Sequence, residues 1–142
     1  GQVKPLAGKR VLVADDEPNI RETIAEVLRK QGAEVSECKN GHEACAVLEA
    51  EDSRFDLVLS DIKMPYRNGY EIFAHARRYH EHVPVLLMTG FGYDPQHSIV
   101  RASQEGLQSV LFKPFKVEQL LDEVFAAIGV DKTSTPASPA AG

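Results

Sequence analysis

The chain alternates between short apolar runs and longer segments that have helical periodicity. Residues 10–15, "RVLVAD", form an almost uninterrupted apolar run. Residues 18–32 follow, and they place Ile20, Ile24 and Leu28 on one helical face. The pattern therefore predicts a buried strand followed by an amphipathic helix.

The same alternation continues to residue 128. We predict further strands at residues 33–40, 55–61, 83–89 and 108–112, and further helices at residues 41–51, 69–80, 95–106 and 117–128. The continuous apolar run at 55–61 is typical of a strand buried on both faces, whereas the mixed segment 33–40 suits a sheet edge. Regular alternation indicates an α/β fold, in which a parallel sheet has helices on both faces and right-handed connections.

Composition indicates one folded domain with a short segment on either side. The chain has 142 residues, of which 43% are hydrophobic, enough for one ordinary core. Residues 131–142 are rich in Ser, Thr, Pro and Ala and contain no core-forming pattern. We predict an N-terminal linker at residues 1–8, a folded domain at 9–129 and a disordered tail at 130–142.

Charge and the length of the apolar runs exclude several kinds of protein. A net charge of -5 argues against a nucleic-acid or anionic membrane surface. The apolar runs are too short to cross a bilayer, and the first residues lack the apolar core of a signal peptide. Cys38 and Cys45 form neither a disulfide framework nor a zinc motif, so we interpret them as small apolar core residues. We expect a cytoplasmic protein that binds neither nucleic acid nor membrane.

Charged and polar side chains stand where four of the predicted strands end. In an open parallel sheet, ligands bind beyond the carboxyl ends of the strands. The residues found there are Asp15 and Asp16, Asp61, Thr89 and Lys113. Carboxylates beside an ammonium suit Mg²⁺ that shares oxygens with a phosphate. Such a cation also explains why Asp15 and Asp16 are adjacent although their charges repel. We interpret the next residue, Glu17, as a surface residue.

Four motifs resemble those of response-regulator receiver domains of two-component signalling. They are "VLVADDEPNIR", "DLVLSDIKMP", "MTG" and "FKPF", and they occur in the family's order between about Lys9 and Ile128. The resemblance implies a flavodoxin-like (βα)5 fold whose five parallel strands have the order 2-1-3-4-5. It leaves open whether the chain is a stand-alone receiver or the receiver segment of a hybrid histidine kinase or longer response regulator.

The resemblance implies a role for each acidic residue at the strand ends. Asp61 is the expected phosphoacceptor, and its donor is a phosphohistidine on a histidine kinase or histidine phosphotransfer protein. Asp15, Asp16, Asp61 and the main-chain carbonyl of Lys63 are the expected Mg²⁺ site, with Asp16 as a direct ligand and Asp15 acting through water or charge.

The remaining motif residues are expected to sense the phosphoryl group. Lys113 would contact a phosphoryl oxygen, would pair with Asp61 in its absence, and would precede a cis peptide bond. Thr89 would hydrogen-bond the phosphoryl group. Val110 stands where many receivers have an aromatic switch residue, so the resemblance leaves open whether the usual aromatic readout operates here. Phe112, on the same side of the strand by two-residue alternation, is an alternative for part of that role, but we interpret it as an ordinary core residue.

The implied function is a phosphorylatable switch that catalyses only its own phosphorylation and dephosphorylation. A non-phosphorylated receiver acting as a protein-binding module is one alternative, and the intact set of motif residues argues against it. A Mg²⁺-dependent phosphohydrolase is another, but Lys63 and Phe91 supply no general acid or base. The output partner cannot be read from the sequence, and we expect a monomer or a weak phosphorylation-dependent dimer.

Overall fold

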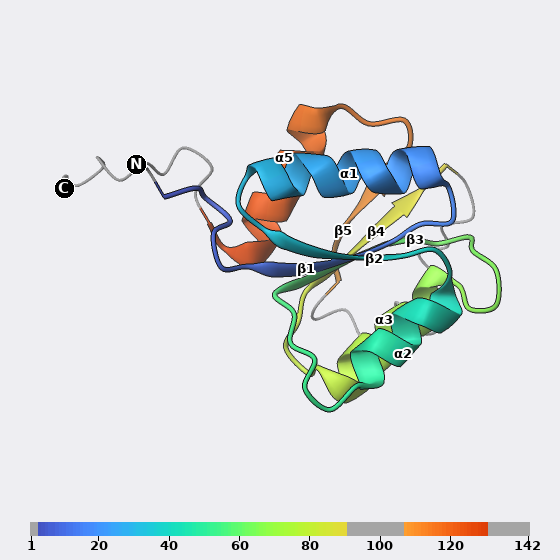
Figure 1. The fold of residues 1–142 in the computed structure, drawn as a ribbon. Helices are drawn as coiled ribbons and strands as arrows, with labels where there is room; N and C mark the ends of the chain where they lie inside the picture. The colour runs from blue at the N-terminus through green and yellow to red at the C-terminus, as the bar shows by residue number, and fades with distance from the viewer. Residues whose placement is uncertain (1–2, 91–106, 131–142) are drawn as a thin grey trace.

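The computed structural model describes residues 3–90 and 107–130, and Figure 1 shows a central sheet between two layers of helices. The sheet is parallel and has the predicted order β2-β1-β3-β4-β5. Its strands are β1 (Arg10–Ala14), β2 (Glu34–Cys38), β3 (Leu57–Asp61), β4 (Val85–Thr89) and β5 (Leu107–Phe112). The described helices are α1 (Pro18–Lys30), α2 (Gly41–Glu49), α3 (Gly69–Tyr79) and α5 (Val117–Ile128). Phe91 and the predicted helix at 95–106 lie outside the described residues.

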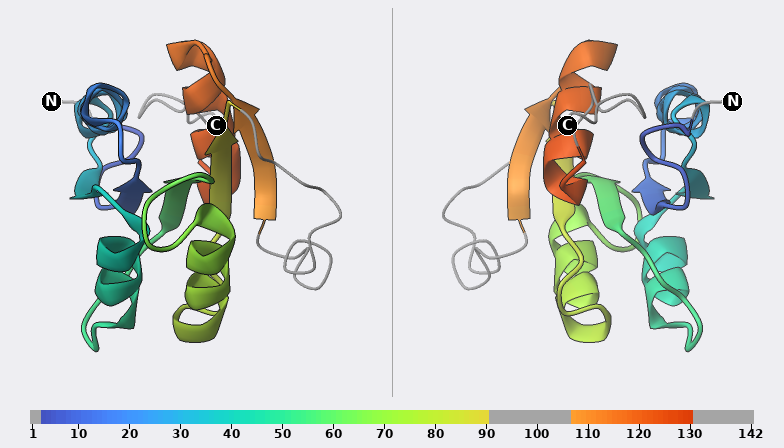
Figure 2. Two further views of the ribbon diagram at one scale, coloured as in Figure 1. Left: turned by 90° about the vertical axis from the view of Figure 1, so that its right-hand side faces the viewer. Right: turned by 90° about the vertical axis from the view of Figure 1, so that its left-hand side faces the viewer.

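Two apolar cores lie on the two faces of the sheet. Figure 2 shows α2 and α3 on one face and α1 and α5 on the other. Successive residues of β1 point to opposite faces, so Leu12 packs with α2 and α3 while Val11 and Val13 pack with α1 and α5. All residues of β3 and β4 are buried, and the mixed strand β2 lies at the sheet edge, as predicted.

Local capping explains where the helices begin. Pro18 occupies the first turn of α1, where its missing N–H costs no helical hydrogen bond. Asn40 accepts a hydrogen bond from the N–H of Glu43 at 2.8 Å, which caps α2. Asn68 and Glu71 form a reciprocal capping box at the start of α3. These caps hold the loops at the carboxyl edge of the sheet in place.

The segment before β1 contributes one side chain to the core. Leu6 is fully buried, and its N–H donates a hydrogen bond to the carbonyl of Gln31 at 2.8 Å. Residue 6 therefore packs against the end of α1, within the segment predicted to be a linker. The boundaries of the linker, domain and tail stay predictions. None of the helices in residues 3–90 and 107–130 is long and apolar enough to cross a membrane.

Cys38 and Cys45 are buried, free thiols in the core beneath α2 and α3, as the sequence predicts. Burial raises the pKa of the Cys38 thiol to about 12, and the charge of Glu43 adds to the effect. Burial also raises the pKa of Cys45. Both side chains therefore remain protonated, apolar core residues.

Gly41 is required by a close approach between α2 and the loop at residues 62–68. A Cβ atom at Gly41 would lie 1.9 Å from the carbonyl oxygen of Arg67. We expect Gly41→Ala to lower the free energy of unfolding by about 1–3 kcal/mol, because the loop must shift to admit the methyl group. Urea denaturation measures this loss. Gly90→Ala is the matched control, since its Cβ would have no neighbour within 4 Å; equal stabilities of the two variants would contradict the prediction.

Candidate functional site

Three carboxylates meet at the carboxyl edge of the sheet. One oxygen of each of Asp15, Asp16 and Asp61 lies within 4.8 Å of the others. β1 and β3 are neighbours in the sheet, so the acids that follow or end these strands are brought together. Asp15 and Asp61 are buried and Asp16 is exposed. The predicted acidic cluster is therefore present.

Asp15 is held at every polar atom. Its N–H donates to the carbonyl of Cys38 at 3.1 Å, and its own carbonyl accepts from Arg21 at 3.0 Å. Its carboxylate accepts from the N–H of Glu17 and from Nζ of Lys113, both at 2.9 Å. Asp15 therefore provides a fixed negative charge at the back of the site.

Lys113 is the cation of the cluster. Its Nζ lies 2.9 Å from Asp15, 3.3 Å from Asp61 and 3.4 Å from Glu17. Burial lowers the pKa of Lys113, but the hydrogen bond to Asp15 and the charges of Asp15 and Asp61 outweigh it, so the net shift is upward. The pairing with Asp61 was expected, whereas the shorter contact with Asp15 was not.

Asp61 lies at the end of β3 and faces both charges. Its Oδ1 accepts from the N–H of Ile62 at 3.0 Å, and its Oδ2 faces Lys113. Burial raises the pKa of Asp61 from 3.8 to about 6, the charge of Asp15 adds to this rise, and Lys113 opposes it. The negative charge on Asp61 is therefore unfavourable in the metal-free protein, and a bound cation would relieve it.

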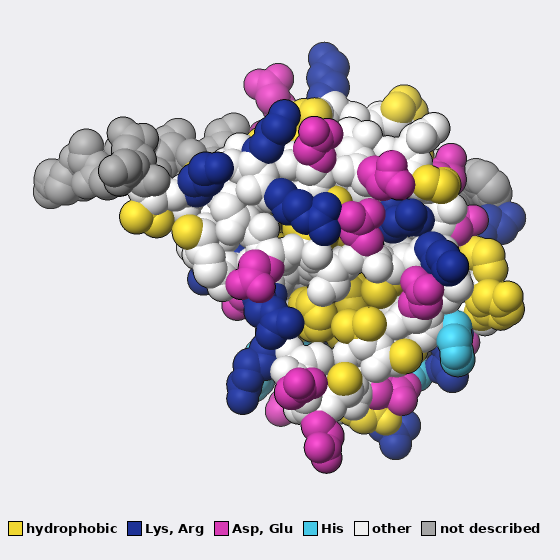
Figure 3. Space-filling view, viewed as in Figure 1, with side chains coloured by type: hydrophobic (Ala, Val, Ile, Leu, Met, Phe, Trp, Pro, Cys, Tyr) yellow, Lys and Arg dark blue, Asp and Glu magenta, His cyan; other side chains and the backbone are white. Residues whose placement is uncertain are grey.

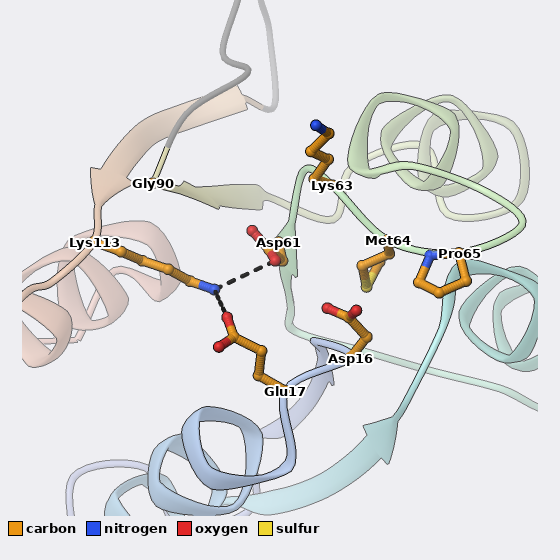
Figure 4. A pocket seen from close by; sticks show the side chains of 8 residues that line it. All are labelled: Asp16, Glu17, Asp61, Lys63, Met64, Pro65, Gly90 and Lys113. Carbon is orange, nitrogen blue, oxygen red and sulfur yellow. Dashed lines mark hydrogen bonds and ion pairs between the residues drawn. The ribbon is translucent and has the colours of Figure 1, made fainter.

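A cavity of about 500 Å³ opens over these acids. Figure 4 shows that the carboxylates of Asp16 and Asp61 face this space, while the side chain of Lys63 extends away from them. The lining residues are Asp16, Glu17, Asp61, Lys63, Met64, Pro65, Gly90 and Lys113. The lining role of Met64 and Pro65 was not predicted, and its one sequence signal is their place just after Asp61. The role of the Lys63 carbonyl stays a prediction.

The ends of β4 and β5 complete the edge of the site. Thr89 is buried, and its carbonyl accepts a hydrogen bond from the N–H of Lys113 at 2.8 Å. The Lys113–Pro114 bond is cis, as expected. Val110 is partly buried against the core beneath α2 and α3, and its switch role stays a prediction.

The interpretation of Phe112 as a core residue is wrong. Its side chain is 63% exposed. Phe112 lies at the carboxyl end of β5, which is an edge strand of the sheet, and alternation along a strand does not tell whether another element covers a side chain there.

The donor set of this site fits Mg²⁺ and a phosphoryl group. Mg²⁺ prefers carboxylate and water oxygens and often shares them with phosphate. Asp15, Asp16 and Asp61 supply three carboxylates, and Lys113 supplies a positive charge for phosphoryl oxygens. The fold and this edge together define a class: doubly wound α/β proteins with an acidic cation site at the strand ends.

The family follows from a direct match. The profile described as "Response regulator receiver domain" matches residues 11–125. The chain therefore belongs to the response regulator receiver domain family, as the motifs indicated.

Individual relatives agree with this assignment. The chain is 37% identical over 114 residues to the response regulator receiver protein Anae109_2439 of Anaeromyxobacter sp., covering 80% of this chain and 46% of that protein. It is 31% identical over 120 residues to sporulation initiation phosphotransferase F of Bacillus subtilis, covering 84% of this chain and 93% of that protein. The chain thus spans about half the length of the first relative and nearly all of the second.

A solved structure shows the same fold. It is that of response regulator protein TrrA from Thermotoga maritima in complex with Mg(2+)-BeF. The TM-score is 0.70 at 31% identity, and the match covers 84% of this chain and 98% of that one.

Proposed function

We propose that this receiver domain accepts a phosphoryl group on Asp61 with the help of Mg²⁺. The observation that carries the proposal is the meeting of three carboxylates within 4.8 Å, with Nζ of Lys113 3.3 Å from Asp61. Asp15, Asp16, Asp61 and the main-chain carbonyl of Lys63 would hold the ion. When bound, Mg²⁺ would neutralise charge on the phosphoryl oxygens.

Asp61 acts as the nucleophile in this proposal. One carboxylate oxygen forms a bond to phosphorus while the bond between phosphorus and the donor nitrogen breaks. The electron pair of that bond returns to the imidazole of the donor histidine. A histidine kinase or a histidine phosphotransfer protein supplies this phosphohistidine, as is general in receiver domains.

Lys113 and Thr89 read the new group. The ammonium of Lys113 already lies beside the Asp61 carboxylate, so it can pair with an oxygen of a phosphoryl group on Asp61. Thr89 ends the neighbouring strand β4, and its hydroxyl would hydrogen-bond the phosphoryl group. Val110, on β5, would follow that movement. The equilibrium between two conformations of a protein-binding surface would then shift.

Intact mass spectrometry after incubation with acetyl phosphate and Mg²⁺ tests this function. We expect one phosphoryl adduct on the wild-type protein, because the carboxylate of Asp61 is a buried nucleophile that lies beside the ammonium of Lys113. The Asp61→Asn variant and a sample with EDTA are the controls, and both should remain unmodified. An adduct that persists on Asp61→Asn would place the chemistry elsewhere. Absence of an adduct, together with an amide spectrum unchanged by beryllofluoride and Mg²⁺, would favour a non-phosphorylated protein-binding module.

A further inference from the structure

The side chain of Arg21, in the first turn of α1, contacts the main chain of the acidic cluster. Nη1 of Arg21 donates a hydrogen bond to the main-chain carbonyl of Asp15 at 3.0 Å. Nε of the same side chain pairs with Glu37 of β2 at 3.3 Å. The Arg21 side chain is only 14% exposed. One guanidinium therefore ties the turn after β1 to the edge strand.

The carbonyl that Arg21 holds belongs to the peptide group between Asp15 and Asp16. This group is planar, so fixing its oxygen also fixes the orientation of its N–H, which is the amide of Asp16. The same plane contains Cα of Asp16, so the contact also restrains the atom that carries the Asp16 side chain. Within the described residues, the Asp16 carboxylate has no hydrogen bond or ion pair that would orient it. Its position depends on the backbone.

We propose that Arg21 is a positioning residue of the cation site. It holds the Asp15–Asp16 peptide so that the Asp16 carboxylate faces Asp61 across the cavity. The inference rests on the proposed function, because the role requires that the acidic cluster binds Mg²⁺.

Simple electrostatics predicts the opposite effect of removing Arg21. A positive charge beside a carboxylate cluster repels Mg²⁺, so its loss alone should tighten binding. Loss of positioning should weaken binding, because Asp16 then spends less time directed at the ion. The sign of the change in Mg²⁺ affinity therefore separates the two explanations.

Arg29 provides a matched control on the same network. Its Nη1 lies 3.0 Å from the other carboxylate oxygen of Glu37, and its Nη2 donates to the carbonyl of Val35. Arg29 therefore shares the acidic partner of Arg21 but does not contact Asp15. Figure 3 shows basic and acidic side chains interleaved over α1 and β2.

Mg²⁺ titrations of the wild type, Arg21→Met and Arg29→Met test the proposal. The Kd can be followed by amide chemical shifts, and thermal unfolding in EDTA confirms that each variant is folded. We expect Arg21→Met to raise the Kd for Mg²⁺ about tenfold, the scale typical for the loss of a group that orients a metal ligand. Arg29→Met should leave the Kd unchanged or slightly lower.

A double-mutant cycle identifies the residue through which Arg21 acts. In an Asp16→Asn background, Arg21→Met should cause no further loss of Mg²⁺ affinity, whereas a general distortion of the fold would add to it. If Arg21→Met does not fold, Arg21→Lys replaces it, because lysine keeps the charge but cannot form the two-armed contact. Its Kd should also rise.

Three outcomes would overturn the inference. A Kd of Arg21→Met at or below the wild-type value would show that only charge matters. Equal weakening in Arg21→Met and Arg29→Met would assign the effect to Glu37. A wild-type protein that binds no Mg²⁺ would overturn the proposed function as well, which distinguishes that failure from the other two.

Discussion

Replacing Lys113 with methionine is expected to lower the free energy of unfolding of the metal-free protein by about 3 kcal/mol. Removing one partner of a buried ion pair leaves the other charge without compensation, which typically costs 3–5 kcal/mol. Asp15 is fully buried, and the ammonium of Lys113 lies 2.9 Å from its carboxylate. Methionine retains most of the alkyl chain, so the loss reports on charge rather than on packing.

Urea denaturation in EDTA measures this effect of Lys113→Met. Lys116→Met is the matched control, because Lys116 is exposed and lies only three residues further along the chain. We expect a change of no more than about 0.5 kcal/mol for the control. Added Mg²⁺ should restore part of the stability lost in Lys113→Met, since it supplies positive charge to the same acids. Equal effects of the two substitutions would show that Asp15 does not depend on Lys113.

Replacing Asp61 with asparagine is expected to have the opposite effect on stability. The pKa of Asp61 rises from 3.8 to about 6 on folding, mainly through burial and then through the charge of Asp15. Above the folded pKa the carboxyl is ionised in both states, and the folded state bears the full cost of that charge. Asparagine removes the cost, so Asp61→Asn should gain up to about 3 kcal/mol near neutral pH.

The stability difference between Asp61→Asn and the wild type is expected to depend on pH. A pKa that rises on folding stabilises the protonated folded protein, and this contribution is lost as the pH increases through about 6. The stability gap between variant and wild type should therefore be small below about pH 4 and should grow toward pH 6. Urea denaturation at a series of pH values in EDTA measures the gap. Asp52→Asn, at an exposed position, should show no comparable gain, and a gap for Asp61→Asn that does not vary with pH would contradict the assignment.

Much of the fold could be predicted because the sequence pattern and the burial agree. The continuous apolar run at 55–61 became the buried strand β3, and the mixed run at 33–40 became the edge strand β2. Since all strands are parallel, residues at their carboxyl ends share one edge. That reasoning alone brings Asp15, Asp61 and Lys113 together.

Other features depend on details that no sequence pattern records. Alternation gives the side of β5 on which Phe112 lies, but not whether another element covers it. The contact of Arg21 with the Asp15 carbonyl was missed because every main-chain carbonyl can accept such a bond. The choice of Asp15 over Asp61 as the nearer partner of Lys113 depends on distances of a few tenths of an ångström.

The buried thiols of Cys38 and Cys45 have a practical consequence. Maleimide reagents react with the thiolate, which is the nucleophile, and both native cysteines are buried with raised pKa values, Cys38 at about 12. A cysteine introduced on the exposed surface would therefore be the reactive one in the folded domain. Fluorescent or spin probes can thus be attached at a chosen surface position to follow this receiver domain without first removing its own cysteines.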